Sequence, residues 1–182
     1  MTVNGIDTEQ VAGFAQLLTS DADLADITVS TRHRWEGAYT LATRGAGITV
    51  GGDVLPRDEQ HVVSDRPGLF GGHDRGCVPG ELLLAALASC VGSQLVEHAA
   101  LCDVELGGLE LVAEGRLDLR GTLEAPGVPV GLQDVTLDVE VSSRVEDQVL
   151  DDLMALAVRT SPVAATLGAG VPVRPSVRHA SP

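Results

Sequence analysis

The stretch ELLLAALASCVGSQLVEHAAL, residues 81–101, decides the fold of this chain, and Pro79 stands just before it. Proline is favoured in the first turn of a helix, and the carboxylate of Glu81 suits the positive end of the helix dipole. The first half of the stretch is apolar nearly all round, as in a helix that is buried on most sides. We therefore predict a long, largely buried helix, whose second half gains a polar face from Gln94, Glu97 and His98.

Before this helix, alternating polar and apolar residues predict strands. Residues 27–64 contain several such runs and read as a β-meander, with a turn signal at Gly51-Gly52-Asp53. Residues 57–75 are rich in Asp, Gly and Pro, which is typical of a loop.

After the helix, alternation returns at residues 104–120 and 135–141. Apolar residues at helical spacing then predict a helix over 146–160, which Pro162 ends. Residues 172–177 read as a last edge strand, because their prolines cannot donate a ladder hydrogen bond. Strands and helices follow one another without parallel βαβ alternation, so the predicted fold class is α+β.

The N-terminal residues predict a separate short element. Residues 7–19 form an amphipathic pattern that Asp7 or Thr8 would cap, with one apolar face made of Val11, Phe14, Leu17 and Leu18. We expect an N-terminal helical extension at residues 1–26 and the main domain at 27–182.

Composition excludes several classes of function. The chain carries 12 basic and 26 acidic residues, a net charge of −14, so it would repel nucleic acid. All the basic residues are arginine, which excludes Schiff-base, pyridoxal-phosphate and Walker-A lysines. The N-terminus has no signal-peptide pattern, and no uninterrupted apolar run approaches the ~18 residues of a membrane span. We expect a cytoplasmic protein without a membrane segment.

Three cysteines, Cys77, Cys90 and Cys102, form no disulfide framework. Cys90 lies in the predicted helix, where the commoner role of a cysteine is that of a small apolar core residue. A reactive thiol there needs a cation to stabilise its thiolate, and only arginine can supply one in this chain. Gln94 lies one turn beyond Cys90 on the same face, with Glu97 next along, so this stripe is a candidate site.

The other two cysteines are weaker candidates. Cys102 lies about 18 Å from Cys90 along a continuous helix, too far for a disulfide. Cys77 precedes the helix and could reach Cys90 only if its loop folds back. The pairs His73/Cys77 and His98/Cys102 offer a zinc ligand set, but their spacing is not that of a known zinc finger, and we predict no metal. Sequence motifs of hydrolases and of dinucleotide-binding proteins are absent.

The segment GGHDRGCVPGELLLAALASC, residues 71–90, strongly resembles the central-helix signature of the OsmC/Ohr superfamily. Residues 34–37 (RWEG) and 159–167 (RTSPVAATL) resemble its first strand and second-helix exit, and the resemblance covers roughly residues 27–178. It implies an intertwined homodimer with antiparallel sheets wrapped around long central helices and with its sites at the dimer interface. It also implies that one cysteine attacks an organic hydroperoxide, that a second cysteine forms a disulfide with it, and that an external dithiol reduces this disulfide. The resemblance further implies that an Arg and a Glu keep the first cysteine ionised and oriented.

Departures from this pattern bear on the chemistry. Ser161 stands where the family has its second cysteine, so the usual disulfide cannot form. Gly80 stands where the family has its Glu; neighbouring Glu81 is the possible substitute, although it is turned by about 100° on a helix. Arg34 is the best match to the family arginine, with Arg32 and Arg44 as rivals. The chain resembles a subgroup with Ser-Pro-Val in place of Cys-Pro.

Three functions follow as hypotheses. The first is a one-cysteine peroxidase without a cofactor, in which Cys90, Arg34 and Glu81 are catalytic and Gln94 and Ser161 line the substrate. An external thiol, or Cys77, would then resolve the sulfenic acid. The second is a non-catalytic relative that binds a hydrophobic small molecule at the dimer interface, and the third is a zinc-stabilised structural protein.

Overall fold

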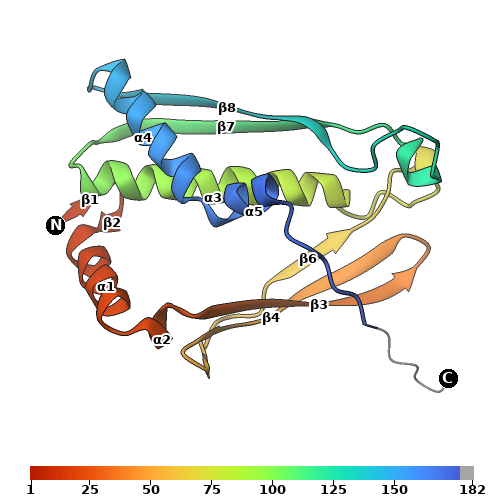
Figure 1. Cartoon of the computed structure of the whole chain (residues 1–182), viewed down its shortest axis with the longest axis horizontal. Coiled ribbons are helices and arrows are strands. Elements are labelled where there is room, and N and C mark those ends of the chain that lie inside the picture. Colours follow the sequence, from red (N-terminus) through yellow and green to blue (C-terminus); the bar gives the residue numbers. More distant parts are fainter. Residues whose placement is uncertain (177–182) are drawn as a thin grey trace.

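The computed structural model describes residues 1–176, apart from the side chain of Ala46 (Figure 1). It is an α+β fold of antiparallel sheets around one long helix, as predicted. The predicted helix is α3, Pro79–Leu101, and it runs through the middle of the molecule.

One side of α3 is covered by the C-terminal half of the chain (Figure 1). Strands β7 (Leu106–Arg116) and β8 (Gln133–Ser143) form an antiparallel hairpin, and α4 (Asp147–Thr160) and α5 (Pro162–Ala169) pack beside it. The buried core joins these elements to α3 and consists of Leu87, Val91, Leu95, Ala99, Val104, Leu153 and Ala157.

A second sheet lies apart from α3. It contains β3 (Ile27–Gly37), β4 (Thr40–Val50), β5 (Asp53–Val54) and β6 (His61–Ser64), with β4 paired to the other three. Residues 27–36 of β3 are all exposed, including large apolar side chains such as Val29 and Trp35, which are 70% and 69% exposed. The meander predicted at 27–64 is therefore confirmed, but within residues 1–176 no helix buries this strand.

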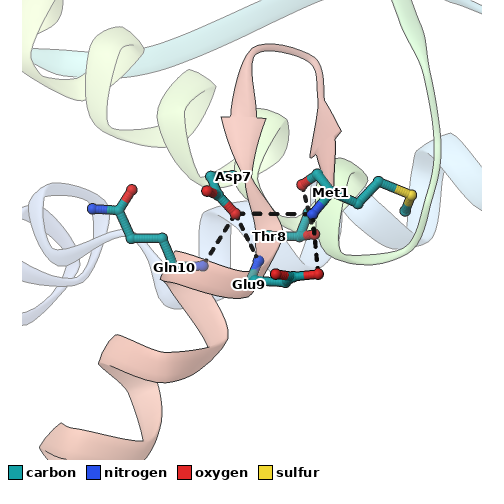
Figure 2. Close-up of polar contacts among 5 residues, drawn as sticks. All are labelled: Met1, Asp7, Thr8, Glu9 and Gln10. Atoms are coloured by element: carbon teal, nitrogen blue, oxygen red, sulfur yellow. Dashed lines mark hydrogen bonds and ion pairs between the residues drawn. The ribbon is translucent and has the colours of Figure 1, made fainter.

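The N-terminal residues form two short strands before the expected helix. Strands β1 (Thr2–Val3) and β2 (Ile6–Asp7) make a hairpin, followed by α1 (Thr8–Ser20) and α2 (Ala22–Ala25). Of the two predicted caps, Asp7 is the one used: its Oδ1 accepts the N–H groups of Glu9 and Gln10 at 3.1 and 3.2 Å (Figure 2). The sequence Asn4-Gly5 supplies the turn, and both residues have positive φ, as a two-residue hairpin of this kind requires.

Three boundaries differ from the prediction. Residues 172–176 form no strand, because two prolines leave few donors and no neighbouring strand pairs with them; Val177 lies outside the described residues. Pro162 ends α4 as predicted, but it also opens α5 from the first helical position. The strand predicted to reach residue 120 ends at Arg116, where a loop with the short 3-10 helix η2 (Gly121–Leu123) begins.

The chain exposes more surface than a compact protein of its size. Its accessible area is 13256 Å², whereas a compact monomer of 18.8 kDa exposes about 8,300 Å². The difference is about 5,000 Å² for one chain, at least as much as each partner loses in an obligate dimer, where both partners together bury about 2,000–5,000 Å². Many large apolar side chains contribute to it, among them Ile27, Val29, Trp35, Leu83 and Leu101.

Helix α3 itself is only partly covered by its own chain. By length and composition α3 meets the criterion of a membrane span. The sequence had predicted no membrane segment, because no uninterrupted apolar run is long enough. The core helix of a soluble protein meets the same criterion. Only 28% of its most apolar window is buried within the chain. Residues 1–176 therefore leave several apolar side chains of this helix exposed, among them Leu83 and Leu101.

The loop that leads into α3 is held by a buried carboxylate, Asp65, which is 1% exposed. The hydroxyl of Thr40 donates to it at 3.1 Å, and the backbone N–H groups of Arg66, His73 and Arg75 donate at 2.8, 3.2 and 3.3 Å. Burial alone raises the pKa of Asp65, but these four hydrogen bonds outweigh burial and hold the pKa below its ordinary value of 3.8. The ionised carboxylate therefore stabilises this loop.

We predict that Asp65→Asn lowers the urea midpoint of unfolding at pH 7. The amide keeps one acceptor oxygen, and its NH₂ group cannot accept from the donors that face the other carboxylate oxygen. Because folding lowers the pKa, the stabilisation is complete above 3.8 and is lost as pH falls through the folded-state value. The difference from the unmodified protein should shrink on acidification below about pH 4. Asp58→Asn, an exposed loop position, is the control. Equal midpoints for Asp65→Asn and the unmodified protein at pH 7 would contradict this role.

Candidate functional site

Cys90 is half-buried at the middle of α3, while Cys77 and Cys102 are exposed near the two ends of that helix. At 100° per residue, Cys90 lies about 60° from Leu87, at the border of the buried face. Leu83, Ala86 and Leu101 fall on nearly the same side as Cys90, and all three are exposed. The thiol therefore lies where the covered and uncovered faces of α3 meet.

The polar residues predicted beside Cys90 have separate surroundings. Gln94 and Glu97 are half-buried on the same side of α3, one and two turns beyond the thiol. His98 Nε2 lies 2.9 Å from the Thr160 hydroxyl, which donates its own proton to Leu156 O at 2.9 Å, so the imidazole N–H is the donor to Thr160. This bond fixes the end of α4 against α3.

Ser161 lies at the junction of α4 and α5 and is fully buried. Its hydroxyl oxygen accepts the N–H of Ala164 at 3.2 Å and so caps α5. The next residues, Val163 and Ala164, pack against the core that includes Leu87 and Val91. The side chain at this position is thus a structural cap next to the central helix.

The side chain of Glu81 is hydrogen-bonded to the backbone at the start of α3. Its Oε2 accepts the N–H of Val78 at 2.8 Å, which satisfies one of the free donors of the first turn. Nine residues separate it from Cys90, which places the two on opposite sides of the helix and about 13 Å apart along it. The structure does not bring Glu81 to the thiol of its own chain.

Arg34 belongs to β3 of the second sheet, which lies apart from α3, the helix that carries Cys90 (Figure 1). With Arg32 and Arg44 it lines a surface hollow of about 340 Å³ that also contains Glu36 and Glu59. Arg44 pairs with Glu59 at 3.5 Å, and Glu36 pairs with Arg75 at 3.5 Å. Within residues 1–176, Arg34 makes no ion pair.

The two cysteine–histidine pairs considered for zinc lie at opposite ends of α3, roughly 34 Å long. Among the described residues, no group of three or more His, Cys, Asp and Glu side chains is placed to hold a metal ion. The backbone of Cys77 forms an isolated β-bridge with Ser64, and its carbonyl accepts the N–H of Asp65. These backbone contacts hold the loop before α3 against β6, so the loop does not fold back over Cys90. Cys77 cannot resolve a sulfenic acid at Cys90 of the same chain in this conformation.

The sequence model of the OsmC-like protein family matches residues 72–176, which include α3, Cys90 and Ser161. The chain belongs to this family. It is therefore a member of the OsmC/Ohr superfamily, as its central-helix signature predicted. No curated protein matches the chain.

Solved structures share the fold at low identity. An OsmC-like protein of unknown function from Vibrio cholerae has 16% identity and a TM-score of 0.60, over 76% of this chain and 92% of that one. A putative osmotic stress induced and detoxification response protein from Psychrobacter arcticus has 15% identity and a TM-score of 0.59, over 76% and 88%. An organic hydroperoxide resistance protein from Elizabethkingia anophelis has 19% identity and a TM-score of 0.55, over 78% and 89%.

Sequence reasoning missed two residues that shape the site's frame. Asp65 organises the loop before α3, but nothing near it in sequence marks a buried carboxylate, since its donors are mostly backbone groups. Asn4 fixes the N-terminus to the far end of α3. Here a signal existed, because Asn-Gly between two short apolar runs is the strongest short-range hairpin pattern.

We predict that Ser161→Ala lowers the free energy of unfolding by about 1 kcal/mol, the usual cost of losing an N-cap hydroxyl. Urea denaturation measures the change. Ser20→Ala, an exposed hydroxyl at the end of α1, is the control and should change stability by less than about 0.5 kcal/mol. If both variants were equally stable, Ser161 would not be acting as a cap.

Proposed function

We propose that this protein is a one-cysteine thiol peroxidase that reduces organic hydroperoxides through Cys90 and works as a cytoplasmic homodimer. The observation that carries the proposal is the position of Cys90, half-buried in an apolar helix at the edge of its uncovered face. Membership of the OsmC/Ohr superfamily and the hydroperoxide resistance named for the Elizabethkingia anophelis relative support the substrate class. No cofactor is needed for this chemistry.

The reaction is a two-electron oxidation of sulfur. The Cys90 thiolate attacks one peroxide oxygen, an S–O bond forms as the O–O bond breaks, and the leaving alkoxide takes a proton to become an alcohol. Cys90 becomes a sulfenic acid. An apolar helix face around the thiol favours a substrate with a hydrocarbon group over hydrogen peroxide.

Arg34 is the proposed cation that stabilises the thiolate. Arg34 and Arg32 both line the hollow without an ion pair within residues 1–176, whereas Arg44 is paired with Glu59. Of the two, Arg34 is the better match to the family arginine. Because β3, which carries Arg34, lies apart from α3 of the same chain, the proposal places the thiol and the guanidinium together across two copies (Figure 1). The large exposed area and the open face of α3 support that arrangement.

The second half of the cycle requires a reductant from outside the chain. A hydroxyl at Ser161 cannot form a disulfide. Cys77 precedes the first turn of α3, whereas Cys90 lies at the middle of this helix, so the two thiols of one chain are too far apart to react. An external thiol therefore attacks the sulfenic sulfur and releases water, and a second external thiol then releases Cys90 and leaves as a disulfide. Gln94 and Ser161 remain candidates for the substrate-lining wall.

A second candidate function is a non-catalytic protein that binds a hydrophobic molecule at the dimer interface, with Cys90 as part of the wall. Two observations favour it: Ser161 and Glu81 both serve as helix caps rather than as free reactive groups. A hollow of about 540 Å³ on the second sheet, lined in part by Val29, Val54 and Leu55, offers apolar surface.

Peroxide treatment of the reduced protein separates these two functions. We predict that cumene hydroperoxide oxidises Cys90 at least about 100-fold faster than free cysteine, and faster than hydrogen peroxide does, as mass spectrometry of the labelled thiols will report. Cys90→Ser should abolish the fast phase, while Cys102→Ser, an exposed thiol, should leave it unchanged. Oxidation of Cys90 no faster than free cysteine would exclude the peroxidase and leave the binding function.

The cation can be identified by substitution. We predict that Arg34→Gln slows the oxidation of Cys90 on the order of 10- to 100-fold, the usual cost of removing one electrostatic group from a reacting centre. Arg32→Gln and Arg44→Gln remove equal charge from the same hollow and serve as matched controls. A larger loss in either control than in Arg34→Gln would assign the role to that arginine instead.

A further inference from the structure

Helix α1 is fixed at both ends to different parts of the chain. At its start, Asn4 Nδ2 donates to Val104 O at 2.9 Å and Asn4 Oδ1 accepts the N–H of Leu106 at 2.9 Å, which ties the β1–β2 hairpin to the exit of α3. At its end, α2 reaches the turn after β4, where the N–H of Gly51 donates to Asp26 O at 3.3 Å. The helix therefore spans from the central helix to the second sheet (Figure 1).

The first turn of α1 is also held in one orientation. Besides the Asp7 cap, the Thr8 N–H and hydroxyl donate to Met1 O at 2.9 and 3.0 Å, and the terminal ammonium lies 3.4 Å from Glu9 Oε1 (Figure 2). These contacts order the first residues of the chain, at a cost in conformational entropy. They give α1 a defined direction even though none of its residues is buried.

The apolar face of α1 lacks a cover within the described residues. Val11 and Leu18 are half-buried on the side that faces the body of the chain. Phe14 and Leu17 follow on the same flank of the helix, and they are 51% and 55% exposed. Burial of large apolar side chains stabilises a protein, so the exposure of Phe14 and Leu17 on a helix held in one direction points to a partner.

We infer that α1 is a strap that packs its Phe14–Leu17 flank against a second copy of this chain, at the margin of the proposed dimer interface. The position of α1 supports this occupant, because it joins the two layers whose uncovered surfaces, α3 and β3, would bind the second copy. β3 begins directly after the extension and carries two further exposed apolar side chains, Ile27 and Val29. The inference rests on the homodimer of the proposed function but not on peroxidase activity.

Subunit exchange in the full chain tests the strap. Protein labelled with ¹⁵N is mixed with unlabelled protein, and native mass spectrometry follows the mixed dimer. We expect Phe14→Asp/Leu17→Asp to exchange at least about tenfold faster than the unmodified protein, since two charges would be forced into an apolar contact. Ala12→Asp/Gln16→Asp adds the same two charges to the exposed opposite side of α1 and should exchange at the unmodified rate.

A direct contact test keeps the inference falsifiable if the charged variant folds poorly. With p-benzoylphenylalanine in place of Phe14, irradiation should give a covalent species of two chains, and the same group in place of Gln16 should give none. Equal exchange rates in the two charged variants, or equal cross-linking from both positions, would overturn the strap while leaving the dimer intact. Unmodified protein that is monomeric throughout would instead remove the proposed dimer, and the strap with it.

Discussion

The structure depends on one constraint, which is that the first half of α3 is apolar nearly all round and is stable in water only when most of its sides are covered. Its own chain covers one side with the β7–β8 hairpin, α4 and α5, and leaves the side of Leu83, Ala86 and Leu101 open. Apolar surface of this extent is costly in water. The second sheet likewise exposes apolar side chains, and within residues 1–176 no helix buries β3.

Cys90 lies at the boundary between these two sides, and this position gives the thiol its chemical interest. A cysteine deep in the core would be inert, and one on the open surface would be unselective. At the boundary, its own chain shields the thiol on one side, and a molecule that binds to the open side of α3 lies next to it. The charged groups that could activate it, above all Arg34, lie on the sheet that one chain cannot bring to it.

Much of the fold could be predicted from the sequence, because Pro79 and the Leu/Ala-rich run after it define α3, and strict alternation defines β3, β4, β7 and β8. The site was harder to predict. Helical spacing placed Gln94 beside Cys90, but it could not reveal that Glu81 and Ser161 would be occupied as helix caps, since those roles depend on partners at Val78 and Ala164. The hydrogen bonds of Asp65 could not be predicted either, because their donors, Thr40 and three backbone N–H groups, come together only in the folded chain.

The central claim, that a second copy covers the open face of α3 and completes the site at Cys90, is tested most directly by the molar mass of the full chain in solution. Sedimentation equilibrium in detergent-free buffer at micromolar concentration should give twice the chain mass of 18.8 kDa. A stable species of 18.8 kDa, or a protein that stays in solution only with detergent, would contradict the account.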